Sequence, residues 1–551
     1  MNPAIATSIV GGLIALAALT IPHSGILHLL VEKPGERLEE LLFGITLFKY
    51  SLAAFGVFLI AVGRLPIWQA MPRGDERVIH SRHSSLSVIG VMAVLAGAAV
   101  LRFYRLDSGL WHDEILAYVN YARLPFGEIV STYWDQNQHF LYTLLAHASI
   151  VVFGDSAWSL RLPAALFGIG SVWALYLFGR QVTNVRESVL ACALAAFSYH
   201  HVWFSQNARG YIGLLFWTLL ASWLLLRGLR EGHPRLWLLY GAAAALGVYT
   251  NTAMLFVILG HFVIYLWELW TRGGRWAGLF LGFCFAGFLT LLLHALVLPQ
   301  MMAGVEESTV PAWKNPLWAV LEFMKAMKIG FAGIIAAVGA LLVFGLGLWS
   351  FGRTEPSVVL LMILPAMACA AVVLGVGYHV WPRLFFFTFG FAALIVVRGA
   401  MLLGEKASRL LRASPTSAQR VGTIFAAGLI LVSAVSLPRA YAPKQDFLAA
   451  LNFIDAQKRP GDKVAMVGLV AFTYKNFYQR DWEEVTTVEE LKSIQRQSRH
   501  TWMLYTFPTH VSAVYPEIMR AVKMEFQIVK QFPGTIGDGA IFVSRSVQPL
   551  S

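Results

Sequence analysis

A succession of long apolar runs constrains this chain more than any other feature. A helix needs about 20 mostly apolar residues to cross the hydrocarbon core of a bilayer. Apolar residues make up 57% of the 551 residues and charged residues only 13%, whereas about 25% of the residues of a soluble domain are charged. The sequence therefore predicts a polytopic α-helical membrane protein, and it excludes a soluble enzyme, a disordered scaffold and a secreted disulfide framework. We expect about 13 transmembrane helices, near residues 4–20, 41–63, 86–104, 157–179, 187–203, 208–228, 235–249, 252–270, 276–298, 329–350, 357–377, 383–403 and 420–438.

The basic residues predict how these helices are oriented. The formal net charge is +12, but short cytoplasmic loops of membrane proteins carry an excess of Lys and Arg, so this charge does not indicate a nucleic-acid partner. The alternation of basic connections holds if residues 138–153 form a helix along the outer membrane face instead of crossing it. We then expect a cytoplasmic N-terminus, with residues 103–156 and everything after residue 438 outside. The basic connections contain Arg64, Arg73, Arg77 and Arg82; Arg180 and Arg186; Arg227, Arg230 and Arg235; Arg272 and Arg275; Arg353; and Arg398, Lys406, Arg409, Arg412 and Arg420.

The chain divides into three parts by composition. Residues 1–85 form an N-terminal extension with two transmembrane helices, residues 86–440 form the membrane core with its first outer loop at 103–156, and residues 441–551 are polar. The pattern of the last part predicts a small α/β domain outside the membrane, without a P-loop, a dinucleotide fingerprint or a pair of metal ligands. We expect helices at 444–458, 487–497 and 510–523 and strands at Lys463–Leu469, Thr501–Phe507 and Ala540–Ser544.

Cysteines and outward-facing carboxylates are both scarce. Cys192, Cys284 and Cys369 lie inside apolar runs without paired spacing, so neither a disulfide nor a zinc site is predicted. The first outer loop contains an adjacent carboxylate pair, Asp113–Glu114, just after a predicted span. Adjacent side chains on a helix point about 100° apart, so at most one of the two faces a given ligand squarely. The alternative is structural, because acidic residues in the first turn of a helix are favoured by the macrodipole.

Four segments around these residues carry a resemblance to a known superfamily. Trp111-His-Asp-Glu-Ile-Leu-Ala-Tyr resembles the W-x-D-E-x-x-Y signature of the integral-membrane glycosyltransferases of the GT-C superfamily, which includes the dolichyl-phosphate-mannose protein mannosyltransferases and the bacterial aminoarabinose transferases of lipid A. Three further segments match in the same order. They are Asn137-Gln-His-Phe-Leu-Tyr-Thr-Leu-Leu, similar to H-P-P-L-Y-x-L-L; Phe153-Gly-Asp-Ser-Ala-Trp-Ser-Leu-Arg-Leu-Pro, similar to F-G-x-S-x-x-x-x-R-L-P; and Ser205-Gln-Asn-Ala-Arg-Gly-Tyr, similar to S-Q-E-A-R-x-Y.

The resemblance covers roughly residues 86–440 and has two departures from the family pattern. The prolines of the H-P-P segment are missing next to His139, and Asn207 replaces the usual Glu. The resemblance implies a GT-C fold and a hexosyl- or pentosyltransferase that moves a sugar from a polyprenyl-phosphate donor to a glycan, lipid or protein acceptor. The reaction would take place on the outer face of the bacterial cytoplasmic (inner) membrane, with the C-terminal domain in the periplasm.

The resemblance also implies catalytic residues. Asp113 matches the family's acidic residue and would take the proton of the acceptor hydroxyl as it attacks the anomeric carbon. Glu114 would be an orienter or a ligand of the acceptor site. Arg209 and Arg383, at the outer ends of two predicted spans, would bind the leaving phosphate through paired N–H donors. For Arg383, the segment Tyr378-His-Val-Trp-Pro-Arg-Leu-Phe-Phe resembles the family's late P-R-Y/F segment.

Three further residues, His139, Gln206 and Tyr211, are candidates for binding the substrate. Each has a structural alternative. His139 could be a hydrogen-bonded residue on an apolar stretch, Gln206 could cap a helix, and Tyr211 could belong to the aromatic belt of the interface. The two arginines could likewise extend to the interface only for solvation.

Cofactor and function have open alternatives as well. With one phosphate on the donor, arginines can neutralise the leaving group, so we expect no cofactor and favour no obligatory metal, with a divalent ion as the alternative. A transporter or flippase of lipid-linked saccharides would also need a basic headgroup site. Transporters often carry ionisable residues at mid-membrane depth, and the predicted spans have almost none.

Overall fold

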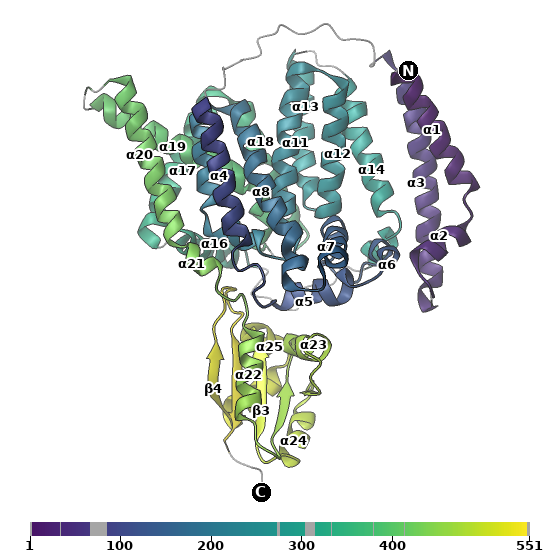
Figure 1. Ribbon diagram of the computed structural model, residues 1–551, viewed down its shortest axis with the longest axis vertical. Coiled ribbons are helices and arrows are strands. Elements are labelled where there is room, and N and C mark those ends of the chain that lie inside the picture. Colours follow the sequence, from purple (N-terminus) through teal and green to yellow (C-terminus); the bar gives the residue numbers. More distant parts are fainter. Residues whose placement is uncertain are drawn as a thin grey trace.

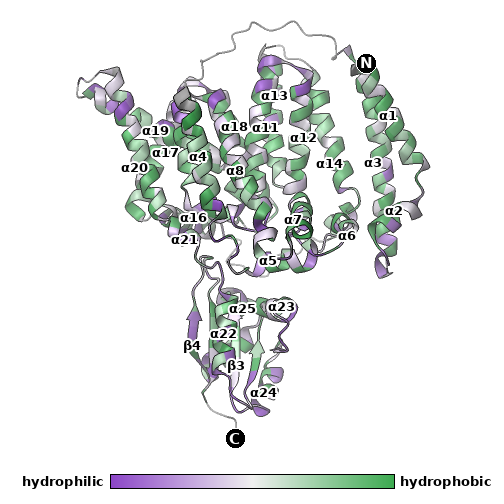
Figure 2. Ribbon diagram, in the orientation of Figure 1, coloured by the Kyte–Doolittle hydropathy of each residue, from purple (hydrophilic) through white to green (hydrophobic). Residues whose placement is uncertain are grey.

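The structure is a computed structural model that describes residues 3–33, 35–66, 85–272, 276–303, 315–331, 333–377, 380–410, 412 and 414–547. Several residues used above lie outside these ranges, namely Arg73, Arg77, Arg82, Arg275, Tyr378 and His379. The described part consists of a large helical body and a small sheet domain that projects from one end of it (Figure 1). The body is largely hydrophobic, whereas hydrophilic residues are frequent in the sheet domain (Figure 2).

The helical body is built from the predicted apolar runs, and it contains additional short helices between them. Its helices are α1 (Pro3–Thr20), α2 (His23–Leu30), η1 (Gly35–Arg37), α3 (Leu38–Arg64), α4 (Ser85–Phe103), α8 (Ala157–Val182), α9 (Val185–Ala196), α10 (Tyr199–Ser205), α11 (Tyr211–Glu231), α12 (Pro234–Thr250), α13 (Met254–Arg272), η4 (Gly278–Cys284), α14 (Phe285–His294), α15 (Leu298–Ala303), α16 (Pro316–Gly330), α17 (Ile334–Thr354), α18 (Pro356–Gly375), η6 (Pro382–Thr388), α19 (Phe389–Leu410), α20 (Pro415–Val435) and α21 (Leu437–Ala440).

The protein is a multi-pass membrane protein, as predicted. Within the described ranges, eight helices are long and apolar enough to cross a bilayer, or nine if α1 and α2, which are bent by 90° from each other, form one span. The predicted count of 13 is therefore not established. Several predicted runs form helices that are too short for this test: α9 has 12 residues and α12 has 17.

The run predicted at 187–203 is not one helix, because α9 ends at Ala196 and α10 begins at Tyr199. The fully buried side chain of Arg102 on α4 lies at this break. Its guanidinium donates to the backbone oxygen of Ala196 at 3.1 Å and contacts Nδ1 of His201 at 2.7 Å. A buried helix end needs partners for its last carbonyl groups, and Arg102 supplies one, so the chain can turn inside the body.

The segment 103–156, predicted to be the first outer loop, connects α4 to α8 at the end of the body that faces the sheet domain (Figure 1). It contains α5 (His112–Ala117), the π-helix η3 (Tyr118–Ala122), α6 (Phe126–Ser131) and α7 (Phe140–Phe153). Figure 1 shows α7 nearly end-on, whereas α8 and α11 run along the page. That course agrees with the prediction that residues 138–153 lie across the direction of the spans.

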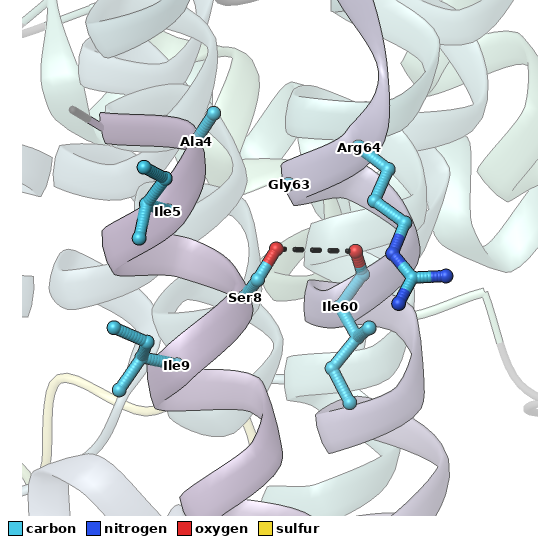
Figure 3. A pocket seen from close by; sticks show the side chains of 7 residues that line it. All are labelled: Ala4, Ile5, Ser8, Ile9, Ile60, Gly63 and Arg64. Carbon is cyan, nitrogen blue, oxygen red and sulfur yellow. Dashed lines mark hydrogen bonds between the residues drawn. The ribbon is translucent and has the colours of Figure 1, made fainter.

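Two N-terminal helices pack together through small residues. A Cβ atom at Gly11 would lie 2.5 Å from the backbone oxygen of Gly56, so α1 and α3 approach each other as closely as glycine permits. At the end of this pair, Ser8 Oγ donates to the backbone oxygen of Ile60 at 3.5 Å in a small open pocket (Figure 3). This pocket lies near the N-terminus, at the end of the body opposite the sheet domain (Figure 1). Its lining residues are Ala4, Ile5, Ser8, Ile9, Ile60, Gly63 and Arg64.

The C-terminal residues form the predicted α/β structure around a five-stranded sheet with the order β2-β1-β3-β5-β4. Strand β1 pairs in parallel with β2 and β3, and β5 pairs antiparallel with β3 and β4. The predicted helix at 510–523 is two helices, because Pro516 begins a second one, and α23, β2 and β4 were not expected. The elements are α22 (Phe447–Gln457), β1 (Lys463–Met466), α23 (Leu469–Asn476), β2 (Glu483–Glu484), α24 (Val488–Arg496), β3 (Thr501–Thr506), α25 (Pro508–Val514), α26 (Pro516–Glu525), β4 (Phe526–Phe532) and β5 (Ile541–Ser546).

Candidate functional site

The two adjacent carboxylates of α5 have different surroundings. Glu114 is completely buried and bonds to Arg161 of α8 through both oxygens, at 2.7 and 2.6 Å. It also accepts the backbone N–H of Trp111 at 3.3 Å and that of Ala208 at 2.8 Å. Burial alone would raise the pKa of Glu114, but Arg161 and Lys444 outweigh it and lower the pKa below its ordinary value. Glu114 therefore ties α5 to α8 and to the segment before α11.

Asp113 points to two arginines that come from distant parts of the chain. Its Oδ2 accepts from Nη1 of Arg209 at 2.6 Å and from Nη1 of Arg383 at 3.2 Å. The Asp113 side chain is 17% exposed, Arg209 is 3% exposed and Arg383 is 36% exposed. Burial would raise the pKa of Asp113, but Arg209 and Arg383 outweigh it and hold the pKa below its ordinary value. We call Asp113, Arg209 and Arg383 the Asp113 group.

Aromatic rings form one wall of the Asp113 group. The ring centre of Tyr211 lies 5.5 Å from the Cζ atom of Arg209 and 6.0 Å from that of Arg383, within the range of a cation–π contact. The His139 ring packs edge-on against Tyr211, with 5.5 Å between the ring centres. Burial, together with Arg209, lowers the pKa of His139 well below its ordinary value, so this ring is neutral at pH 7.

Local backbone geometry explains how Arg209 reaches this place. Gly210 follows it, and a Cβ atom at Gly210 would lie 2.5 Å from the backbone oxygen of Thr250 and 3.0 Å from the His139 ring. Only a glycine allows this close approach. Among the described residues, Nε of Arg209 and Nε2 of His139 are buried and have no hydrogen-bond partner. The site thus holds polar atoms whose hydrogen bonds are not satisfied by the protein.

Gln206 lies apart from the Asp113 group. Its Nε2 donates to the backbone oxygens of Arg102 at 3.0 Å and Tyr104 at 2.7 Å, at the end of α4. This is the helix-capping role considered as the alternative to substrate binding. The structure thus brings together Asp113, Arg209, Arg383, His139 and Tyr211, and it places Glu114 and Gln206 behind them as supports.

Two supporting residues were not assigned a role from the sequence. Arg161, the partner of Glu114, stands in the R-L-P segment quoted above. The match of that segment to the family pattern could have indicated that Arg161 has a role. Asn207 stands where the family pattern has Glu. Its Oδ1 accepts the indole N–H of Trp111 at 3.2 Å, so the residue at this position supports the segment that begins α5. Within the described ranges, no group of three or more His, Cys, Asp or Glu side chains is arranged to hold a metal ion.

Comparisons with known proteins show what this chain is similar to. Residues 138–299, which include His139, Arg161 and Arg209, match the family model described as dolichyl-phosphate-mannose-protein mannosyltransferase. The chain is 37% identical over 124 residues to the putative mannosyltransferase YkcB and 33% identical over 117 residues to the putative mannosyltransferase YycA, both of Bacillus subtilis. Each match covers 21% of this chain, and the chain spans only 16% and 17% of the lengths of these relatives.

The fold gives an independent comparison. The apo oligosaccharyltransferase of Archaeoglobus fulgidus aligns with 82% of this chain and 74% of that chain, with a TM-score of 0.50 and 11% identity. The resemblance to the GT-C glycosyltransferases is confirmed. The predicted fold class, a helical membrane core of GT-C type with a small C-terminal sheet domain, is confirmed with it. Another GT-C protein, ArnT of Cupriavidus metallidurans bound to undecaprenyl phosphate, aligns with 84% of this chain and 99% of that chain, with a TM-score of 0.44 and 14% identity.

Proposed function

We propose that this protein transfers a sugar from a polyprenyl-phosphate carrier to an acceptor on the outer face of the bacterial cytoplasmic membrane. The observation that carries the proposal is the Asp113 group, in which one carboxylate oxygen bonds to two guanidinium groups. One negative charge faces two positive charges, so the group has a net charge of +1 and attracts an anion. The partly exposed Arg383 leaves it open to a ligand.

The three residues have complementary roles in the transfer. The Asp113 carboxylate takes the proton of the acceptor hydroxyl while the acceptor oxygen bonds to the anomeric carbon. The bond between the anomeric carbon and the phosphate oxygen breaks, and the phosphate leaves with the electron pair. Arg209 and Arg383 donate hydrogen bonds to the phosphate oxygens, where negative charge develops as the bond breaks.

Binding of the donor would also activate the base. A carboxylate paired with two arginines has a lowered pKa and is a weak base. The phosphate of the donor competes with Asp113 for the same N–H groups, so its binding loosens both ion pairs and raises the pKa of Asp113. The base therefore becomes stronger only when the donor is in place. His139 and Tyr211 complete the binding surface, through the unpartnered Nε2 atom and the aromatic face.

The positions of the basic residues support an outer-face location. Arg230 bonds to Gln181 and Arg398 bonds to Glu187, which places these arginines at the α8–α9 connection. Helix α8 begins beside the first outer loop and ends at this connection, so the Asp113 group and the basic connections lie at opposite ends of the body. With the basic end cytoplasmic, the N-terminus is cytoplasmic and the sheet domain is periplasmic.

Charge chemistry favours a donor with a single phosphate. Asp113 and Glu114 are both paired with arginines, so the cations that neutralise the leaving group are supplied by the protein itself, and we propose no obligatory metal. The sugar is a hexose or a pentose. The acceptor is a glycan, a lipid or a protein.

The decisive experiment compares Asp113→Asn with Glu128→Gln, a carboxylate change on α6 of the same loop. The proteins are purified in detergent and supplied with a radiolabelled polyprenyl-phosphate sugar and an envelope extract from the host. Asp113→Asn should lose transfer by about 10²–10⁴-fold, the usual contribution of a general base, whereas Glu128→Gln should keep it. Wild-type turnover by Asp113→Asn contradicts the assignment, and lipid translocation in proteoliposomes without transfer favours a flippase.

A further inference from the structure

A short linker between the helical body and the sheet domain contains two buried polar residues, although linkers are normally exposed. It connects α21 to α22 and contains Lys444, which is 7% exposed, and Gln445, which is 2% exposed. The sheet domain fits tightly against it: Thr535 donates its backbone N–H to Pro443 at 3.1 Å, and a Cβ atom at Gly534 would lie 2.1 Å from the backbone oxygen of Lys444. The sheet domain therefore holds the linker through the backbone at Gly534 and Thr535.

Gln445 connects the sheet domain to the loop that carries Asp113. Its Oε1 accepts the backbone N–H of His112 at 3.2 Å, and its Nε2 donates to Oγ1 of Thr506, at the end of β3, at 3.0 Å. A second contact lies beside this one, because Nδ1 of His112 is 3.1 Å from Oγ1 of Thr473 on α23. His112 directly precedes Asp113, so both contacts, one to the backbone and one to the side chain of His112, restrain the residue next to the carboxylate.

Lys444 connects the same linker to the segment that carries Arg209. Its Nζ donates to the backbone oxygen of Gln206 at 2.7 Å and lies 5.0 Å from the ring centre of Trp203. Trp203 in turn donates its indole N–H to Oγ1 of Thr535 in the sheet domain at 3.0 Å. Two consecutive linker residues therefore hold the two segments that supply Asp113 and Arg209, and neither residue touches the Asp113 group.

We propose that Lys444 and Gln445 are positioning residues, through which the docked sheet domain fixes the Asp113 carboxylate relative to the Arg209 guanidinium. The proposal rests on the proposed function, because it assigns a catalytic use to that geometry. A displacement of about 1 Å in a reacting group can cost about 100-fold in rate, and the two linker bonds oppose such a displacement. The sheet domain is then a part of the site's framework, whether or not it also touches the acceptor.

A positioning role and a simple recognition role affect different kinetic constants. A domain that only binds the acceptor changes KM when its contacts are altered. A domain that positions the base and the phosphate ligand changes kcat, because the geometry of the bound complex is lost while acceptor binding remains.

The test is a set of variants in the full-length protein. Gln445→Met removes both hydrogen bonds at similar size. Thr506→Val removes the bond on the domain side, together with the bonds from Thr506 Oγ1 to the backbone oxygens of Gly539 and Ala540, and Thr506→Ser keeps the hydroxyl group. Lys475→Ala changes an exposed residue on α23 that pairs with Glu484, and it serves as the control. Gln445→Met should lower kcat about 10- to 100-fold with KM near the wild-type value, and Thr506→Val should lower it less. Thr506→Ser and Lys475→Ala should resemble the wild type.

Hydrogen exchange supplies a measurement that does not depend on activity. In Gln445→Met the amide of His112 loses its acceptor, so the segment 111–118 should exchange faster, whereas Lys475→Ala should leave it unchanged. Lys444→Met should have the same effect on the segment 205–211. If Gln445→Met does not fold, Thr506→Val decides in its place.

The possible outcomes separate the two proposals. A higher KM with an unchanged kcat, or unchanged exchange at 111–118, overturns the positioning role. If the wild type transfers no sugar, the proposed function fails, and the exchange data alone decide whether the linker holds the loop.

Discussion

Two partly buried groups of carboxylate and arginine lie at opposite ends of the helical body, and they differ in how their charges are balanced. At the α8–α9 connection, Glu187 accepts from Arg398 at 3.0 Å and from the Asn184 amide at 2.8 Å, so one negative charge meets one positive charge and a neutral donor. In the Asp113 group, one carboxylate oxygen meets two arginines. The first arrangement is electrically complete, whereas the second has a surplus of positive charge.

The balance of charge separates a structural ion pair from a candidate site. The Glu187–Arg398 pair joins α9 to α19 and needs no further partner. The Asp113 group and the adjacent His139 ring keep buried polar atoms without partners, at Nε of Arg209 and Nε2 of His139. Surplus positive charge beside such atoms favours an anionic ligand. Variants at the two groups should therefore differ in their effects on transfer, stability and phosphate binding.

The largest expected effect is on transfer by Arg209→Met. The loss of one preorganised donor to a developing negative charge costs about 10²–10³-fold in rate, so kcat/KM for sugar transfer should fall by that amount. Arg398→Met should leave turnover close to the wild-type value, because Arg398 faces Glu187 at the other end. Equal losses in a radiolabel transfer assay would contradict the comparison.

The next effect is on stability and concerns Arg161. The Glu114–Arg161 pair is almost completely buried, with side chains that are 0% and 1% exposed. Removal of one partner of such a pair costs about 3–5 kcal/mol, so Arg161→Met should lower the unfolding temperature more than Arg398→Met, because Arg398 is 25% exposed. The double variant Glu114→Gln/Arg161→Met should recover part of the loss. Strict additivity of the single variants would show that the pair is not coupled.

A ligand should distinguish the two groups directly. Undecaprenyl phosphate without a sugar, at about 100 times its Kd, should stabilise the wild type by about 2.7 kcal/mol. This stabilisation should persist in Arg398→Met and be lost in Arg209→Met, as measured by thermal unfolding in detergent. Stabilisation of Arg209→Met to the wild-type extent would show that the phosphate binds elsewhere.

The smallest effect is on the pH dependence of stability and concerns Lys444. This lysine is buried, and its Nζ donates to a backbone oxygen instead of a carboxylate. Burial lowers the pKa of Lys444 to about 7, although Glu114 counteracts it. The unfolded chain, with an ordinary lysine pKa near 10.4, therefore binds more protons than the folded protein between these values. Stability due to this group should rise with pH by about 1.4 kcal/mol per pH unit above pH 7. Lys444→Met should lack this rise in unfolding measurements at pH 7.5 and 8.5, and an identical rise in both proteins would contradict it.

The sequence was sufficient for the membrane class and for the residues of the Asp113 group. Asp113 and Arg383 are 270 positions apart, yet the motifs indicated both, because chemistry at a site demands particular residue types. The supports were harder to predict. Gln206 and Glu114 stand in the same motifs as Arg209 and Asp113, and only the fold shows that their side chains bond to α4 and α8 and not to the Asp113 group.

Elements without a periodic pattern were also missed. Strand β4 has buried residues only at its ends, Phe526 and Phe532, and Ile528 and Val529 are both exposed. An edge strand of this kind does not alternate between apolar and polar residues, so it gives no period-2 signal. The break between α9 and α10 was hidden for a different reason, because Arg102 of α4, 94 positions before Ala196, supplies the hydrogen-bond partner at the break.

The contact between His112 and Gln445 has a consequence for biogenesis. The two residues are 333 positions apart, and the helices α8 to α20 lie between them in the chain. During synthesis, the segment with His112 and Asp113 is made before these helices and has no Gln445 partner until residue 445 has been made. The contact that holds this segment can therefore form only after the helices of the body have been synthesised.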